Sequence, residues 1–496
     1  MTTSAQSSVD PSLGALADAI LIPPFPGTTA PRWFLSALER GLAGVTVFGP
    51  NVTGDTPSLT ASLRAAAPVE PVIAIDEEGG DVTRVAFESG SPYPGNLALG
   101  AVDDVALTAS VYAAIGADLF RLGINVDLAP CADVLSLDGS AVVGTRSFGA
   151  DPALVARHIA AAVTGLQSAG LAACAKHFPG HGSTIGDSHL ALPTVLGTLD
   201  EIRARDLPPF VAAIAAGTAA VMPGHLVIPS LTGDMPASLS PAAVTGLLRG
   251  ELGFDGVVIS DGLEMKAASA VFGIPEACVL AVIAGVDLLC LGRDTDEAMY
   301  LAVRSAIADA VTSGRLPGSR LEEAAARIGA LRVRLAGARA AALAGIDAAG
   351  AAGTAAAADI GLVAARLALR RSGPVPSALV NPLIIEVEPE ENIAAGRFTW
   401  GFDLWAPTVR VDPAAGDGVA AETILSEAEG RPLVLDVRDA RTVLPLVESV
   451  LAARPDTVIV EMGVPAWTPP AGTAYLATYG ASRVCAQAAA EALGLA

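Results

Sequence analysis

Lysine is nearly absent from this sequence, since only Lys176 and Lys266 occur among 30 basic residues. Acidic residues number 52, and the formal net charge at pH 7 is −22. A chain this acidic repels nucleic-acid phosphates and anionic membrane headgroups, which argues against either as a partner. Because arginine supplies nearly every other cation, we expect lysine to occur where the particular shape of its side chain is needed.

Cysteines are also few, odd in number and scattered, and they lack the spacing of a metal site. They are Cys131, Cys174, Cys278, Cys290 and Cys485. Each lies in an apolar or alanine-rich stretch, which predicts buried free thiols and a reducing compartment. No apolar run is long enough to read as a membrane span, and the polar N-terminus lacks a signal-peptide pattern. We therefore expect a cytoplasmic protein.

Short apolar segments alternate with helical segments over the first two thirds of the chain, which predicts a parallel α/β fold. The expected strands are 18–23, 44–49, 71–76, 124–129, 171–177, 219–223, 256–261 and 285–291. The expected helices include 104–121, 151–169, 200–216, 240–252 and 296–313. Eight such units are what a (β/α)8 TIM-like barrel requires, and a doubly wound open sheet is the alternative.

The composition then changes to an alanine-rich, arginine-studded stretch, followed by a second strand–helix series. We expect a catalytic barrel over 1–335, a helical linker over 336–374 and a smaller C-terminal α/β sandwich domain over 375–496. Strands are expected in this domain at 378–387, 408–411, 433–437 and 457–462. It contains no histidine and no glycine-rich phosphate loop, which favours a structural or substrate-covering role.

The segment KHFPGHGSTIGDSH at 176–189 carries the strongest chemical signal, because it holds three of the five histidines. Proline and glycine exclude a helix here, so a shaped loop should follow the fifth strand. One interpretation is a metal site using His177, His181 and His189. A second is an acid/base loop in which Asp187 orients His189. Structural histidines are the third interpretation, and Lys176 beside the cluster disfavours a divalent cation.

Two further segments end expected strands with a carboxylate. IDEEGGDVTR at 75–84 delivers Asp76 and a tight glycine loop from which Arg84 could return to the same face. SDGLEM at 260–265 delivers Asp261 after a run of β-branched residues, although Asp–Gly is also a common turn. A carboxylate opposite a proton donor across a barrel mouth is typical of a retaining glycosidase.

Together with RSFG at 146–149 and PASLS at 236–240, these segments closely resemble family 3 glycoside hydrolases of the β-N-acetylglucosaminidase branch. The likeness extends over roughly residues 15–330. It implies that Asp261 is the nucleophile, and that His189 is the acid/base residue with Asp187 orienting it. It also implies that the non-reducing sugar is bound by Asp76, Arg84, Arg146, Lys176 and His177.

The resemblance implies release of terminal β-linked N-acetylglucosamine from muropeptide or chitin-type oligosaccharides, with no cofactor and no metal. Asp81 departs from the basic residue more usual in the family, so the charge near Asp76 could differ. The segment MPGH at 222–225 also departs from the family form, and His225 could shape a neighbouring subsite.

The alternatives are a β-N-acetylglucosaminide phosphorylase, a broad β-hexosaminidase/β-glucosidase, a metal-dependent hydrolase and a non-catalytic sugar-binding barrel. A histidine repels an incoming phosphate less than a carboxylate would, which keeps the phosphorylase open. The aglycone and the oligomeric state are not predicted.

Overall fold

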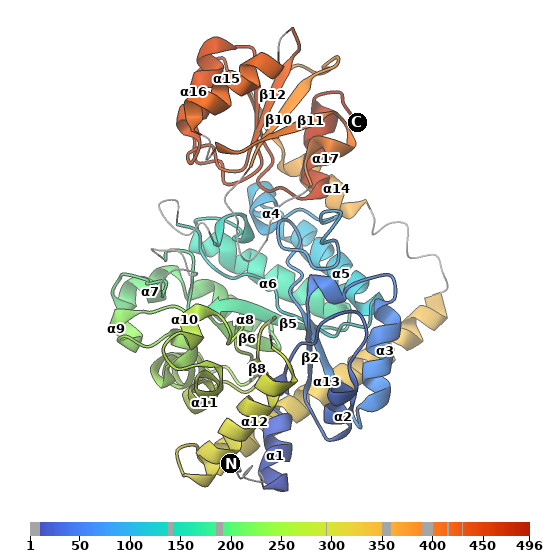
Figure 1. Cartoon of the computed structure of the whole chain (residues 1–496), viewed down its shortest axis with the longest axis vertical. Helices are drawn as coiled ribbons and strands as arrows, with labels where there is room; N and C mark the ends of the chain where they lie inside the picture. The colour runs from blue at the N-terminus through green and yellow to red at the C-terminus, as the bar shows by residue number, and fades with distance from the viewer. Residues whose placement is uncertain are drawn as a thin grey trace, which may run out of the picture.

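The first domain is a barrel of eight short parallel strands surrounded by helices (Figure 1). The computed structural model describes residues 10–136, 142–184, 192–293, 295–349, 359–388, 400–413, 416–428 and 430–496. The barrel strands are β1 (Leu21–Ile22), β2 (Gly44–Val47), β3 (Val72–Ile75), β4 (Val126–Asp127), β5 (Ala172–Phe178), β6 (Ala220–Pro223), β7 (Val257–Val258) and β8 (Leu289–Cys290). All eight lie inside or within one residue of the ranges expected from the sequence.

The strands follow one another around the barrel in sequence order. Strands β2 to β7 form one parallel sheet, and β1 pairs with β8 in parallel. A bridge between Ile259 and Leu288 joins β7 to β8. The Thr46 hydroxyl of β2 donates to the Ile22 carbonyl of β1 at 3.2 Å, which connects the remaining pair. This closed order is that of a TIM-like barrel, and the doubly wound alternative is wrong.

Helices follow the barrel strands, and some of them begin at a residue whose side chain caps the first turn. The helices are α2 (Arg32–Glu39), α3 (Thr56–Ala66), α4 (Asn96–Val102), α5 (Val105–Arg121), α6 (Pro152–Ser168), α7 (Leu199–Arg205), α8 (Pro208–Ala215), the π-helix η4 (Ala242–Glu251), α11 (Ile274–Ala284) and α12 (Glu297–Thr312). Asp151 caps α6 by accepting the Ala153 N–H, with Pro152 in the first turn. The single helix expected at 200–216 is two helices, because Pro208 and Pro209 start a new one.

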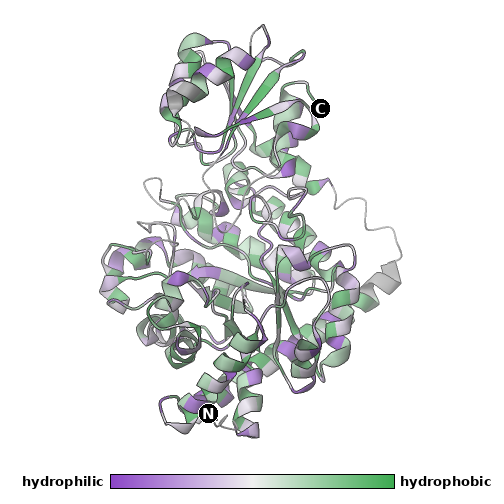
Figure 2. Ribbon diagram, in the orientation of Figure 1, coloured by the Kyte–Doolittle hydropathy of each residue, from purple (hydrophilic) through white to green (hydrophobic). Residues whose placement is uncertain are grey.

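The second domain is a three-layer α/β sandwich. Its sheet has the order β11-β10-β12-β13-β14-β9, in which only β9 is antiparallel. The strands are β9 (Arg370–Ser372), β10 (Leu383–Val387), β11 (Thr408–Val411), β12 (Leu433–Val437), β13 (Val458–Glu461) and β14 (Ala474–Ala477). Alternate residues of β10 enter two cores, with Ile385 among residues of α15 (Asp417–Glu427) and α16 (Leu444–Ala453) and Ile384 among those of α17 (Arg483–Ala492). Figure 2 shows the strands of this sheet coloured mostly as hydrophobic.

Helices before and after the barrel strands complete the barrel and connect it to the second domain. α1 (Pro11–Asp18) lies beside α12, where Tyr300 donates to Asp18 at 2.6 Å (Figure 1). α13 (Gly318–Ala349) runs along the barrel, and α14 (Ile360–Ala368) lies between the domains. In the described part of the chain, no helix is both long and apolar enough to cross a membrane.

Candidate active site

Lys176, near the end of β5, lies between two carboxylates of the loop that follows β3. Its Nζ atom is 2.6 Å from Asp76 Oδ1 and 2.8 Å from Glu78 Oε1. Burial alone would lower the pKa of Lys176, but the two carboxylates raise it above the usual value. The Asp76 side chain is 22% exposed while those of Lys176 and Glu78 are almost fully buried, so Asp76 is the member that meets solvent.

Arg146 forms the second cationic contact of Glu78. Its Nε and Nη2 atoms lie 2.8 Å and 2.7 Å from the two carboxyl oxygens, which is bidentate geometry. Burial would raise the pKa of Glu78, but Arg146 and Lys176 outweigh it and lower that pKa well below the usual value. The backbone carbonyl of Arg146 accepts a hydrogen bond from Asn96 at 2.7 Å, which fixes the chain here. The Arg146 guanidinium is therefore held in place by the buried Glu78 carboxylate.

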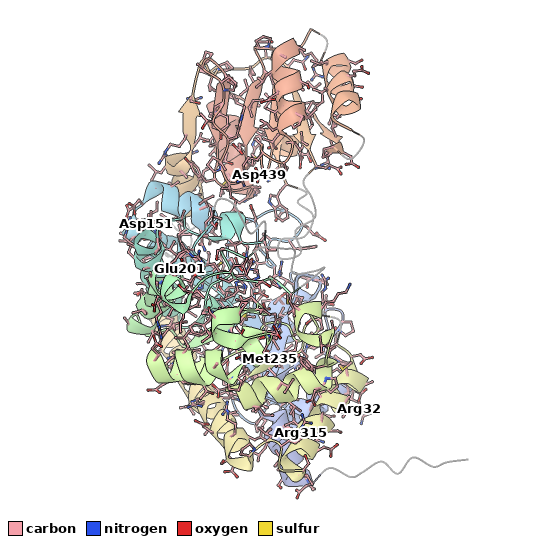
Figure 3. All side chains as sticks on the ribbon, turned by 90° about the vertical axis from the view of Figure 1, so that its left-hand side faces the viewer. Arg32, Asp151, Glu201, Met235, Arg315 and Asp439 are labelled. Atoms are coloured by element: carbon pink, nitrogen blue, oxygen red, sulfur yellow. The ribbon has the colours of Figure 1, made fainter. Side chains whose placement is uncertain are left out.

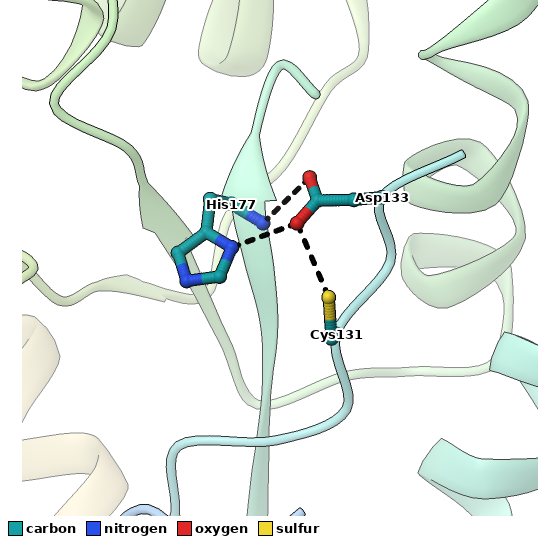
Figure 4. Close-up of side chains that lie close together, drawn as sticks. All are labelled: Cys131, Asp133 and His177. Atoms are coloured by element: carbon teal, nitrogen blue, oxygen red, sulfur yellow. Dashed lines mark hydrogen bonds and ion pairs between the residues drawn. The ribbon is translucent and has the colours of Figure 1, made fainter. Parts of the chain in front are cut away.

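His177 is oriented by Asp133, which lies in the segment after β4 (Figure 4). The Nδ1 atom of His177 is 2.8 Å from Asp133 Oδ2, and its Nε2 atom is 3.4 Å from Arg146 Nη2. Asp133 Oδ1 also accepts the His181 N–H at 2.7 Å. Burial opposes ionisation of Asp133, but His177 and His181 lower its pKa well below the usual value. The carboxylate therefore holds both the imidazole and the start of the histidine loop.

Cys131, Asp133 and His177 also place three possible metal-ligand atoms within 4.8 Å of one another. The Cys131 thiol donates to Asp133 Oδ2 at 3.1 Å. Burial and the Asp133 carboxylate raise the pKa of this thiol well above its usual value. In the described structure, Asp133 is hydrogen-bonded to both Cys131 and His177.

Asp261 follows β7 at the carboxyl-end face of the barrel and is partly buried. Its Oδ1 atom accepts the N–H of Gly262 at 2.7 Å. Burial would raise the pKa of Asp261, but His225, His177, the Gly262 N–H and Lys176 hold it below the usual value. Asp261 is thus an ionised carboxylate among cationic and imidazole groups, which suits a nucleophile.

His225, at the end of β6, is buried against the Asp261 segment. Its Nε2 atom donates to the Gly262 carbonyl at 3.0 Å, and its Nδ1 atom accepts from the Ser238 hydroxyl at 2.6 Å. Ser238 belongs to the segment PASLS. His225 therefore holds the backbone beside Asp261, a more specific role than shaping a neighbouring subsite.

The structure brings together Asp76, Lys176, Arg146 and His177 through the contacts above, and Lys176 and His177 act electrostatically on Asp261. Arg84 donates its backbone N–H to Glu77 at 2.8 Å. Burial raises the pKa of the Glu77 carboxyl to about 7, and the positive charge of Arg84 is among the influences that oppose this shift. Asp187 and His189 lie outside the described residues.

Sequence reasoning missed Glu78 and Asp133. Glu78 lies inside the motif DEEGG, where its position between glycine and a second acid could have indicated an ion pair with Lys176. Asp133 lies in an aperiodic segment after β4, and no sequence signal connects it to His177.

The comparisons with known proteins identify the family of this chain. The model described as the glycosyl hydrolase family 3 N terminal domain matches residues 40–331. The chain belongs to glycosyl hydrolase family 3. A β-hexosaminidase of Stenotrophomonas maltophilia strain K279a is 38% identical over 281 residues, which cover 54% of this chain and 83% of that protein. β-Hexosaminidase A of Pseudoalteromonas piscicida is 34% identical over 336 residues, but they cover 62% of this chain and only 56% of that protein.

A solved structure resembles both domains of this family 3 chain. It is a glycoside hydrolase family 3 β-N-acetylglucosaminidase from Paenibacillus sp. str. FPU-7, with a TM-score of 0.84 and 30% identity. The match covers 97% of this chain and 96% of the other. The expected family, the TIM-like barrel followed by an α/β domain and the enzyme class of glycosidase are confirmed.

Proposed function

We propose that this glycosidase releases terminal, non-reducing β-linked N-acetylglucosamine from oligosaccharides, with muropeptide or chitin-type fragments as substrates. Asp261 carries the proposal, because it is an ionised carboxylate at the carboxyl-end face of the barrel with Lys176 and His177 acting on it. The names of the similar β-hexosaminidases support the N-acetylhexosamine at the cleaved end.

The cationic group around Lys176 supports recognition of the sugar. Asp76 is held by Lys176 and is partly exposed, so a free carboxylate oxygen can accept hydrogen bonds from sugar hydroxyls. His177, with Nδ1 engaged by Asp133, presents Nε2 on the side of Arg146. Both groups are held by contacts within the protein before substrate binds, and such preorganisation reduces the entropy lost on binding.

The proposed reaction has two displacements. In the first, an Asp261 oxygen forms a bond to the anomeric carbon as the glycosidic C–O bond breaks, and the leaving oxygen takes a proton from His189. In the second, water attacks the same carbon and gives its proton to His189, and the bond to Asp261 breaks. Asp187 is proposed to orient His189 on the resemblance of the motif, and the Asp133–His181 hydrogen bond supports a fixed start to this loop.

The first test is the initial rate of 4-nitrophenol release from the N-acetyl-β-D-glucosaminide and the β-D-glucoside, side by side in phosphate-free buffer. A strong preference for the N-acetyl sugar is expected. Equal rates would point to a broad exo-glycosidase, and turnover that requires added phosphate would point to a phosphorylase. Activity lost on chelation would favour a metal-dependent hydrolase.

The roles of the catalytic residues are tested by two variants. Asp261→Asn should lower kcat on the order of 10⁴-fold or more, because the covalent intermediate cannot form. His189→Ala should lose about 10²–10⁴-fold on substrates with poor leaving groups and much less on aryl substrates with good ones. Equal losses on both substrate types would contradict His189 as the acid.

A further inference from the structure

Asp81 joins the second domain to the barrel beside the proposed sugar pocket. Its carboxylate is 9% exposed, and its Oδ1 atom accepts the N–H of Ala481 at 2.7 Å. Its Oδ2 atom accepts the hydroxyl of Thr145 at 2.5 Å. Ala481 lies between β14 and α17 in the second domain, whereas Asp81 and Thr145 lie on two barrel loops. A lysine or arginine side chain could accept neither hydrogen bond.

The loop that carries Asp81 also carries Asp76 and Glu78, and it is tightly folded. Gly79 and Gly80 have φ angles of 72° and 60°, and a Cβ on Gly80 would lie 2.4 Å from Gly95 Cα. The N–H of Glu78 donates to the Val82 carbonyl at 3.0 Å across this turn. Because the turn has little conformational freedom, a displacement of Asp81 would also displace Glu78 and the Lys176–Asp76 pair.

The other contact of Asp81 leads to the same ion pairs. Thr145 immediately precedes Arg146, whose guanidinium is bidentate to Glu78. Through the Thr145 side chain, the Asp81 carboxylate thus connects the segment that carries Arg146 to the segment that carries Glu78. Its position depends in turn on the N–H that the second domain supplies.

Further contacts of the second domain fall on the same two barrel loops. Trp400 is 7% exposed and covers Gly90, where an added Cβ would lie 2.7 Å from Trp400 Cγ. Val464 lies near Gly144, with 3.9 Å between its Cγ2 atom and an added Cβ. Arg438, after β12, adds an electrostatic attraction to Asp81. Figure 3 shows Asp439, the next residue, on the side of the second domain that faces the barrel.

We propose that the second domain is a positioning element of the sugar pocket, and that Asp81 is the residue through which it acts. This inference rests on the proposed function, because it concerns the site that binds the N-acetylglucosamine unit. Asp81 touches no substrate in this role. Asp81 fixes the position of Glu78. Through Glu78 it also fixes the positions of Asp76, Lys176 and Arg146.

The test compares Asp81→Ala and Asp81→Asn in the full chain, using 4-nitrophenyl N-acetyl-β-D-glucosaminide kinetics and calorimetric binding of N-acetylglucosamine. Asp81→Ala should raise KM and the sugar Kd about tenfold with a smaller change in kcat, because misplaced binding groups weaken ground-state and transition-state binding alike. Asp81→Asn should stay within about threefold of wild type, since its amide oxygen still accepts the Ala481 N–H and its NH₂ can donate to Thr145.

Arg370→Ala is the matched control, because Arg370 of β9 donates across the domains to the Ala101 carbonyl of α4 at 2.7 Å, away from both loops. It should leave KM and Kd unchanged. Wild-type KM and Kd in Asp81→Ala would overturn the inference alone, whereas a wild-type chain that does not cleave the substrate would overturn the proposed function as well. Should Asp81→Ala not fold, Ala481→Pro removes the same hydrogen bond from the other side, and an unchanged KM in that variant would overturn the inference.

Discussion

Glu78 in the barrel and Asp436 in the second domain are both buried acids near the carboxyl ends of parallel strands, but of the two only Glu78 forms ion pairs in the described structure. Glu78 is bidentate to Arg146 and contacts Lys176, and its pKa is lowered. Asp436, in β12, is 1% exposed, and within the described residues neither of its oxygens has a hydrogen-bond partner. Burial raises its pKa to about 7, with Arg438 opposing the shift and Glu386 adding to it.

The presence or absence of ion pairs distinguishes an acid of the proposed sugar site, Glu78, from a structural acid, Asp436. Paired with Arg146 and Lys176, Glu78 remains charged at neutral pH, and its ion pair with Lys176 holds the cation that also contacts the partly exposed Asp76. The Asp436 carboxyl is substantially protonated near pH 7 and buried, so it offers no comparable fixed charge. The ion pairs of the proposed sugar site therefore belong to the barrel, and we propose that the second domain contributes through its backbone at Ala481.

Among the variants that test this comparison between Glu78 and Asp436, we expect the largest effect from Lys176→Met. The variant leaves Asp76 and Glu78 without their shared cation, and breaking a buried ion pair in this way typically costs about 3–5 kcal/mol. Urea denaturation should show this loss of unfolding free energy, and hydrolysis of the aryl N-acetylglucosaminide should fall sharply. Lys266→Met is the control, because the other lysine is exposed. A similar loss in both variants would contradict a special role for Lys176.

Asp133→Asn should have the next largest effect. An asparagine cannot give the charged acceptor that Asp133 provides to His177 Nδ1 and the His181 N–H. Hydrogen bonds to charged groups contribute about 1.5–3 kcal/mol, so kcat/KM should fall about 10–100-fold. An unchanged kcat/KM with lower stability would reduce Asp133 to a structural residue.

Asp436→Asn should have the smallest effect. It should stabilise the protein near neutral pH, whereas the two variants above lower stability or activity. The folded carboxyl titrates at about 7 against a reference value of 3.8, so between these pH values the folded state binds more protons than the unfolded state. Wild-type stability should therefore decrease as pH rises from about 4 to 7. The asparagine side chain does not titrate. The Tm of the variant minus that of wild type should therefore increase by about 2–4 °C from about pH 5 to pH 8. A constant Tm difference across this range would contradict the assignment.

The barrel strands were predictable because each is a short apolar run that ends in polar residues at one face. β9 and β14 were not predicted. β9 is an exposed, charged tripeptide that is a strand only because β14 lies beside it, and Ala474–Ala477 is short and alanine-rich. The helix expected at 200–216 was predicted too long, since periodicity outweighed the Pro208–Pro209 start signal.

The sequence by itself determined the family and the barrel, and it predicted most residues of the proposed sugar pocket, because each lies in a compact motif such as DEEGGDVTR or KHFPGHG. Only the tertiary structure decided which groups hold those residues in place. Asp133 reaches His177 across 44 positions, and Asp81 reaches Ala481 across 400. A motif records local spacing, whereas a buried carboxylate takes whichever donors the packed chain places beside it, and those donors can lie anywhere in the sequence.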